Sequence, residues 1–173
     1  MKKIHLDITQ VRDRKENNVN KKLPDWLGKK RIYNSYFNNN ENEIIKWEVL
    51  TIKTKQKIKV RFISTNSDNR QGIRLAIDAG KGTLTTNGVT GRCFELWEDE
   101  CPKEFEIECT SDEGYLSIYN FFEEKTWSGN RVYSHMAYSG MILEQNGNIY
   151  RYKCNNATLK DDFDKLIFEI ELL

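Results

Sequence analysis

Strict alternation of apolar and charged residues is the feature that most constrains how this chain can fold. Residues 57–62 read Lys-Ile-Lys-Val-Arg-Phe, so three apolar side chains share one face and three cations share the other. Residues 104–110 show the same period, with three glutamates opposite Phe105, Ile107 and Cys109. Successive side chains of a β-strand point to opposite faces, so this period is typical of a strand with one buried face.

Two Asn-Gly pairs separate alternating runs and predict tight hairpins. Asn87-Gly88 lies within residues 83–90, and Asn146-Gly147 lies between residues 141–145 and 149–154. Asn and Gly tolerate the two positive φ angles that a type I′ turn requires. Further strands are predicted over residues 3–9, 31–37, 44–53, 57–65, 71–79, 93–97, 104–110, 114–121 and 165–172.

These segments predict an all-β fold of about ten to twelve strands. We expect an antiparallel β-sandwich of jelly-roll type, and a closed barrel is the alternative. One short helical turn is predicted over residues 23–28, because Pro24 suits a first helical turn and Gly28 suits its end. The 173 residues fit one domain spanning 1–173, with the Lys/Asn-rich residues 12–22 as a mobile loop.

The charge is unevenly divided along the chain although the net charge is only +1. Residues 1–81 carry 19 Lys or Arg and 9 Asp or Glu. Residues 82–173 carry 8 Lys or Arg and 17 Asp or Glu. Strands from both halves should interleave in a sandwich, so we expect the two signs to mix on the surface. A net charge near zero argues against nucleic acid as the main partner.

Cysteine usage and hydropathy predict a cytoplasmic protein that does not enter a membrane. Cys93, Cys101, Cys109 and Cys154 form no CxxC pair, so zinc-site spacing is absent. Asp7 stands where a signal peptide would need an apolar run, and no stretch approaches 18 apolar residues. We therefore expect reduced thiols.

Catalytic chemistry has little support in the sequence. The two histidines are His5, on the polar side of a predicted strand, and His135, near Ser134 and Ser139. Catalytic serine and histidine side chains normally converge from distant segments, so this proximity is no signature. A hydrolase that uses His135 or loop carboxylates is the third-ranked hypothesis, and we expect no cofactor.

Oxygen-rich side chains before the last strand raise the question of a calcium site. Its candidate ligands are Asn155, Asp161, Asp162 and Asp164. Calcium takes six to eight oxygen ligands, but the spacing is not that of an EF-hand. The alternative is that these residues cap their own backbone in a surface turn.

Residues 122–140 form the segment most suggestive of ligand binding. They are expected to make a long irregular connection, and such connections in compact domains are often functional. The candidate ligand-binding residues are Trp127, Arg131, Tyr133, His135 and Tyr138. Aromatic side chains with polar tips suit a binding site, but they also suit packing on the protein's own core, which is the favoured alternative.

The residues alone identify no ligand, but they rank the functions. The first hypothesis is a non-catalytic binding domain for a carbohydrate or similar small molecule, because sugars stack on exposed rings such as Trp97 and Trp127. The second is a protein-interaction domain acting as a homodimer. It rests on residues 114–121, where both faces of the strand carry apolar side chains.

Overall fold

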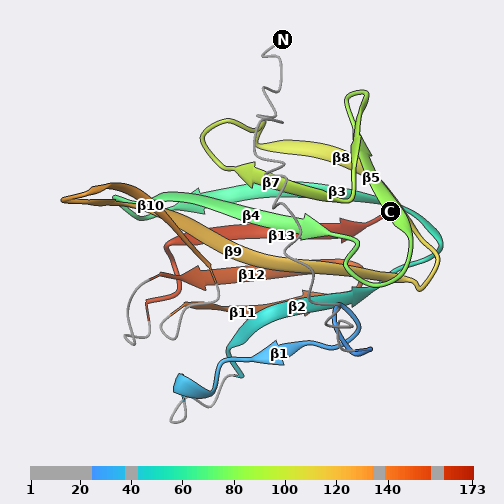
Figure 1. Ribbon diagram of the computed structural model, residues 1–173, viewed down its shortest axis with the longest axis horizontal. Coiled ribbons are helices and arrows are strands. Elements are labelled where there is room, and N and C mark those ends of the chain that lie inside the picture. Colours follow the sequence, from blue (N-terminus) through green and yellow to red (C-terminus); the bar gives the residue numbers. More distant parts are fainter. Residues whose placement is uncertain (1–24, 38–42, 135–138, 157–161) are drawn as a thin grey trace, which may run out of the picture.

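The computed structural model describes residues 25–37, 43–134, 139–156 and 162–173, and these form thirteen strands and one 3₁₀ turn (Figure 1). The predicted strand over residues 3–9 and the predicted loop over 12–22 lie outside the described residues. The elements are β1 (Ile32–Tyr33), η2 (Ser35–Phe37), β2 (Ile45–Thr51), β3 (Lys55–Thr65), β4 (Arg70–Ala76), β5 (Gly82–Thr86), β6 (Val89–Gly91), β7 (Cys93–Trp97), β8 (Glu104–Ser111), β9 (Tyr115–Thr126), β10 (Gly129–Ser134), β11 (Gly140–Asn146), β12 (Ile149–Asn155) and β13 (Leu166–Leu172).

One continuous antiparallel sheet connects these strands in the order β6-β5-β8-β3-β13-β12-β11-β2-β9-β4-β7. β1 is added beside β2, and β10 is added beside β9. The two ends of the sheet approach one another, since β5 contacts β7. The sheet is therefore nearly closed and barrel-like.

The prediction of an all-β antiparallel fold is confirmed, whereas a jelly-roll sandwich is not evident in this strand order. β2 joins the two halves of the sheet, because Ile45 pairs with Met141 of β11 while Glu48–Thr51 pair with β9. The closed-barrel alternative thus describes the sheet better. Side-chain periodicity shows which residues face inward, but it does not show where a strand passes from one half of a sheet to the other.

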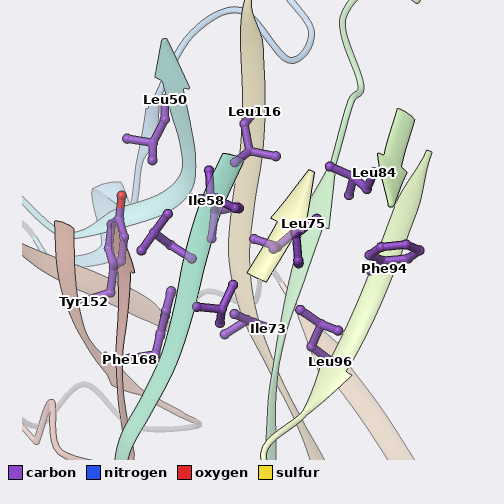
Figure 2. Packing of buried hydrophobic residues seen from close by; sticks show 14 of the residues in the cluster. Leu50, Ile58, Ile73, Leu75, Leu84, Phe94, Leu96, Leu116, Tyr152 and Phe168 are labelled. Atoms are coloured by element: carbon purple, nitrogen blue, oxygen red, sulfur yellow. The ribbon is translucent and has the colours of Figure 1, made fainter. Parts of the chain in front are cut away.

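The inward faces of both halves meet in a single hydrophobic core (Figure 2). The strands β3, β8 and β13 contribute alternate residues, as the sequence period requires. Ile58 and Val60 of β3 are fully buried, as are Ile73 and Leu75 of β4 on the other half. Tyr152 stacks on Phe168, with ring centroids 4.9 Å apart. Burial of these side chains is the main favourable contribution to folding.

The outward residues of β3 lie between two acidic strands. Lys57 and Lys59 contact Glu106 and Glu104 of β8 at 3.2 and 3.6 Å. Arg61 contacts Glu104 and also Glu171 of β13, each at 2.6 Å. The hydrogen bond from Arg61 lowers the pKa of Glu104. Cations from the first half of the chain thus pair with carboxylates from the second, which confirms that the fold mixes the two charges.

We call this surface the charged face. It covers the outward side of β8, β3, β13 and β12. Its charged members are Lys57, Lys59, Arg61, Glu104, Glu106, Arg151, Glu169 and Glu171.

The two predicted hairpins exist, but one turn differs from its prediction. Asn87 and Gly88 have φ of 47° and 79°, which confirms a type I′ turn between β5 and β6. In the second hairpin Asn146 pairs with Ile149, so the two-residue loop is Gly147–Asn148 rather than Asn146–Gly147. Gly147 has φ of 60° at the first loop position, as in a type II′ turn.

The predicted helical turn near residue 25 is a hydrogen-bonded turn instead. The Lys29 amide donates to the Trp26 carbonyl at 3.0 Å, and Gly28 ends the turn with φ of 70°. A Cβ on Gly28 would lie 2.8 Å from Cβ of Asp78, so the turn packs directly on the chain beyond β4. Among the described residues, no helix combines the length and apolar character needed to cross a membrane.

A half-buried ion pair ties this N-terminal segment to the barrel. Glu48 of β2 is 0% exposed. Arg31 donates hydrogen bonds to its carboxylate from Nε at 2.7 Å and from Nη2 at 2.9 Å. The Tyr152 hydroxyl donates to the same carboxylate at 3.2 Å, and the Val49 amide donates to it at 2.9 Å. Burial raises the pKa of Tyr152, and the neighbouring Glu48 adds to this effect. Every lone-pair direction of the buried carboxylate is thereby used.

Replacing Arg31 should destabilise the protein far more than replacing a neighbouring surface cation. Arg31→Leu leaves the Glu48 carboxylate buried without its counter-charge, so we expect a loss of about 3 kcal/mol of unfolding free energy. Lys29 pairs with Glu113 on the surface at 3.1 Å, and Lys29→Leu should cost less than about 1 kcal/mol. Urea denaturation measures both values.

The double variant Arg31→Leu/Glu48→Met shows how much of the lost unfolding free energy comes from the unpaired charge and how much from lost side-chain packing. It should recover most of the stability, because it removes the buried charge as well as its partner. Equal losses for Arg31→Leu and Lys29→Leu would contradict this account of the segment.

Candidate functional site

The segment predicted to be an irregular connection is instead a regular hairpin. β9 runs without a break to Thr126, and β10 pairs with it from Gly129↔Thr126 to Ser134↔Phe121. The prediction of an irregular loop over residues 122–140 is therefore wrong for residues 122–134. The turn Trp127-Ser128 lacks Asn-Gly, and the doublets Phe121-Phe122 and Glu123-Glu124 hide the alternation in the sequence. We call residues 121–134 the arm.

The arm projects from the sheet and presents Trp127 at its tip (Figure 1). The Trp127 residue is 98% exposed. Hydrogen bonds hold the turn below it: the Thr126 hydroxyl donates to the Gly129 carbonyl at 2.6 Å, and Arg131 Nη2 donates to Ser128 Oγ at 3.1 Å. An indole left almost wholly in water on an ordered turn is suited to contact another molecule.

The other predicted ligand-binding residues do not gather around Trp127. Arg131 is exposed on β10, two residues before Tyr133. Tyr133 packs on Phe122, with ring centroids 5.6 Å apart, at the base of the arm. His135 and Tyr138 lie outside the described residues. Part of the predicted set thus supports the core-packing interpretation, and its ligand-binding role stays a prediction.

The predicted calcium ligands are engaged with other groups where the structure describes them. Lys165 Nζ contacts Asp162 at 2.7 Å and Asp164 at 3.5 Å. Asn155 is buried, and Asp161 lies outside the described residues. Across the described part of the chain, no group of three or more His, Cys, Asp or Glu side chains could hold a metal ion. A calcium ion would have to compete with Lys165, and the site stays a prediction.

A pocket of about 230 Å³ opens on the charged face. Its cation, Arg151, donates to Glu169 through Nη2 at 2.6 Å and through Nε at 2.9 Å. The Arg151 guanidinium is thus already paired with Glu169. No free cation therefore remains in the described pocket lining to select an anionic ligand. Its lining residues are Glu144, Gln145, Asn146, Ile149, Arg151 and Glu169.

The outward side of the other half of the sheet is aromatic, and we call it the aromatic face. It lies over β7, β4, β9 and β2, whose alternate residues enter the core. Neighbouring rings contact each other: Trp97 meets Phe121 edge-on at 4.5 Å, and Trp47 meets Tyr119 at 5.5 Å. Its members are Trp47, Arg70, Arg74, Trp97, Tyr119 and Phe121.

Gly72 allows two of these rings to meet. It lies in the central strand β4, directly between Trp97 of β7 and Phe121 of β9. A Cβ at this position would lie 2.6 Å from Cζ of Phe121. Because Gly72 has no side chain, the rings of Trp97 and Phe121 occupy the space above it and contact each other. Aromatic neighbours often cover a glycine in a strand in this way.

Two arginines lie against the rings and are held there by carboxylates. The Arg70 guanidinium lies 4.1 Å from the Trp97 ring centre and donates to Asp99 at 2.9 Å. Arg74 lies 5.3 Å from the Tyr119 ring centre and contacts Asp78 at 3.3 Å. Such cation–π contacts fix both the ring and the cation.

The electrostatics of the aromatic face follow from this arrangement. Burial alone would lower the pKa of Arg74, but its interactions with Tyr119, Cys93 and Asp78 outweigh this effect and raise it. Burial raises the pKa of Tyr119 to about 12, with Arg74 opposing the shift. Burial also raises the pKa of the Cys93 thiol beside Arg74. At neutral pH the face therefore carries charged arginines beside a neutral phenol and a neutral thiol.

Sequence reasoning named Trp97 and the apolar residues 114–121, but it did not assign Trp47, Arg70 or Arg74 to the aromatic face. Its residues come from four strands, so no local spacing reveals them. The available signal was the apolar character of both faces of residues 114–121, because Tyr119 and Phe121 fall on the outward parity. All four cysteines are free, so no disulfide holds these strands together.

The chain matches no protein-family model, and a search of curated proteins returns no significant match.

Adding a methyl group at Gly72 should disrupt the aromatic face. Gly72→Ala forces the Phe121 ring to move, and we expect a loss of about 1–3 kcal/mol of unfolding free energy. Gly91→Ala in β6 is the matched control, because its Cβ would meet Phe94 at an ordinary 3.4 Å. Urea denaturation and the near-ultraviolet circular dichroism of the tryptophans measure the effect. Equal stability of the two variants would show that Gly72 has no such role.

Proposed function

We propose that the protein is a non-catalytic binding domain that takes a carbohydrate on its aromatic face. The supporting observation is the difference between the two outer surfaces of the sheet. The charged face pairs its cations with carboxylates of neighbouring strands, as expected of a solvated surface. The opposite surface instead carries three partly exposed rings, Trp47, Trp97 and Tyr119, beside the buried Phe121, together with two arginines.

The chemistry of the aromatic face matches that of a sugar ring. A pyranose has an apolar C–H face, which packs on a flat aromatic ring, and an edge of hydroxyl groups, which needs donors and acceptors. Trp97 and Tyr119 are partly exposed and supply the rings. Arg74 lies between Tyr119 and Glu95 in the register of the sheet, so donors and acceptors flank the rings. Strand-borne groups of this kind are positioned before the ligand arrives.

Two variants test the site, and one matched variant controls for it. Wild-type protein is screened on a glycan array, and the sugars that bind are titrated by isothermal calorimetry. We expect Trp97→Ala and Glu95→Ala each to weaken binding by about tenfold or more, because each removes a direct contact. Glu95 is exposed, so its variant keeps the fold. Trp127→Ala, on the arm, should bind as wild type does.

The outcomes separate this proposal from its competitors. Silence of the wild-type protein on the array would overturn carbohydrate binding. Loss of binding in Trp127→Ala alone would move the site to the arm, as first expected from the sequence.

A cytoplasmic location is also part of the proposal. The location is supported by four free cysteines, since free thiols persist in a reducing compartment. A hydrolase that uses His135 or loop carboxylates is still the third-ranked functional hypothesis. Several loop carboxylates that it would need are paired, Asp99 and Glu100 with Arg70 and Glu98 with Lys103.

A further inference from the structure

We propose that the arm joins two copies of this chain by pairing β10 with β10 of the second copy, antiparallel, about a two-fold axis at Val132. This interface is separate from the aromatic face, so it stands whether or not the protein binds a carbohydrate.

The first observation is the open edge of β10. Among the described strands, β10 pairs with β9 alone. On the other side of β9, β4 reaches only as far as Glu123, so the arm beyond that residue is a two-stranded ribbon. An isolated two-stranded ribbon is marginally stable in water, and an open strand edge is a template for another strand.

The second observation is which backbone groups of β10 face outward. The two-residue loop closes on the pair Gly129↔Thr126, which is therefore a hydrogen-bonded pair. Alternate residues from Gly129 onward then bond to β9, whereas Asn130 and Val132 direct their amide and carbonyl groups away from it. Val132 is also 58% exposed, although it is β-branched and apolar. The edge thus offers both backbone hydrogen bonds and apolar surface.

The third observation is the side-chain register that a two-fold axis would create. An axis normal to the sheet places a residue of β10 opposite its own copy. An axis at Arg131 would set two guanidinium groups opposite each other, which is unfavourable. An axis at Val132 sets valine against valine, and it sets Arg131 beside Tyr133 of the second copy, where a cation–π contact forms. Charge therefore disfavours the axis at Arg131, and the exposed valine favours the axis at Val132.

A proline at residue 132 tests the open edge without breaking the arm. Val132→Pro removes an amide that points away from β9, so the β9–β10 pairing is kept while the outer edge is blocked. Val132→Thr is the matched control, because it keeps both the amide and the β-branch. In analytical ultracentrifugation we expect wild type and Val132→Thr to dimerise, and Val132→Pro to dimerise at least about tenfold more weakly. Wild type that stays monomeric at its solubility limit, or a proline variant that dimerises equally well, would overturn the proposal.

Cysteine scanning tests the axis itself. At a directly opposed, hydrogen-bonded pair the two Cα atoms lie about 5.5 Å apart, within reach of a disulfide. Val132→Cys should therefore form a covalent dimer under mild oxidation beyond any background from wild type. Asn130→Cys should not, because a shift of four residues separates the two copies of residue 130 by about 13 Å. Equal crosslinking of the two variants would exclude the axis at Val132.

Discussion

The register of β3 between β8 and β13 is the constraint on which the rest of the structure depends. One face of β3 sends Ile58, Val60 and Phe62 into the core, and the other sends three cations between two rows of glutamates. A slip of one residue would bury the cations and expose the apolar side chains, so both faces specify the same pairing. The surface ion pairs add little stability individually, and their role is to exclude the alternative registers.

The other half of the barrel differs in its outward side. Its inward residues complete the same core, while its outward residues include the rings and arginines of the aromatic face. Arg31, directly before β1, pairs with the buried Glu48 of β2 next to Tyr152. The arm extends from the same half, since β9 supplies both Tyr119 and the strand that carries Trp127 to its tip. The two proposed contact surfaces therefore share β9.

Local patterns predicted the fold class well and the site poorly, for physical reasons. The period-two alternation of residues 57–62 and 104–110 reports burial directly, so those strands and their faces agree with the structure. The arm was missed because the turn at Trp127 has no Asn-Gly signal. The closed barrel was only the alternative prediction, because the pattern within β2 does not show that this strand pairs on both sides. Gly72 acquires its role only through Trp97 and Phe121, which lie more than twenty residues away, so no spacing along the chain reveals it.

Native-state hydrogen exchange of β3 tests the central claim most directly. If its register organises the barrel, the amides of Ile58, Val60 and Phe62 should exchange only through global unfolding, with the same free energy and urea dependence as the whole molecule. The amides of the arm should exchange through local opening at much lower free energy. Exchange of β3 by local opening, while β9 or β12 stayed protected, would contradict the account.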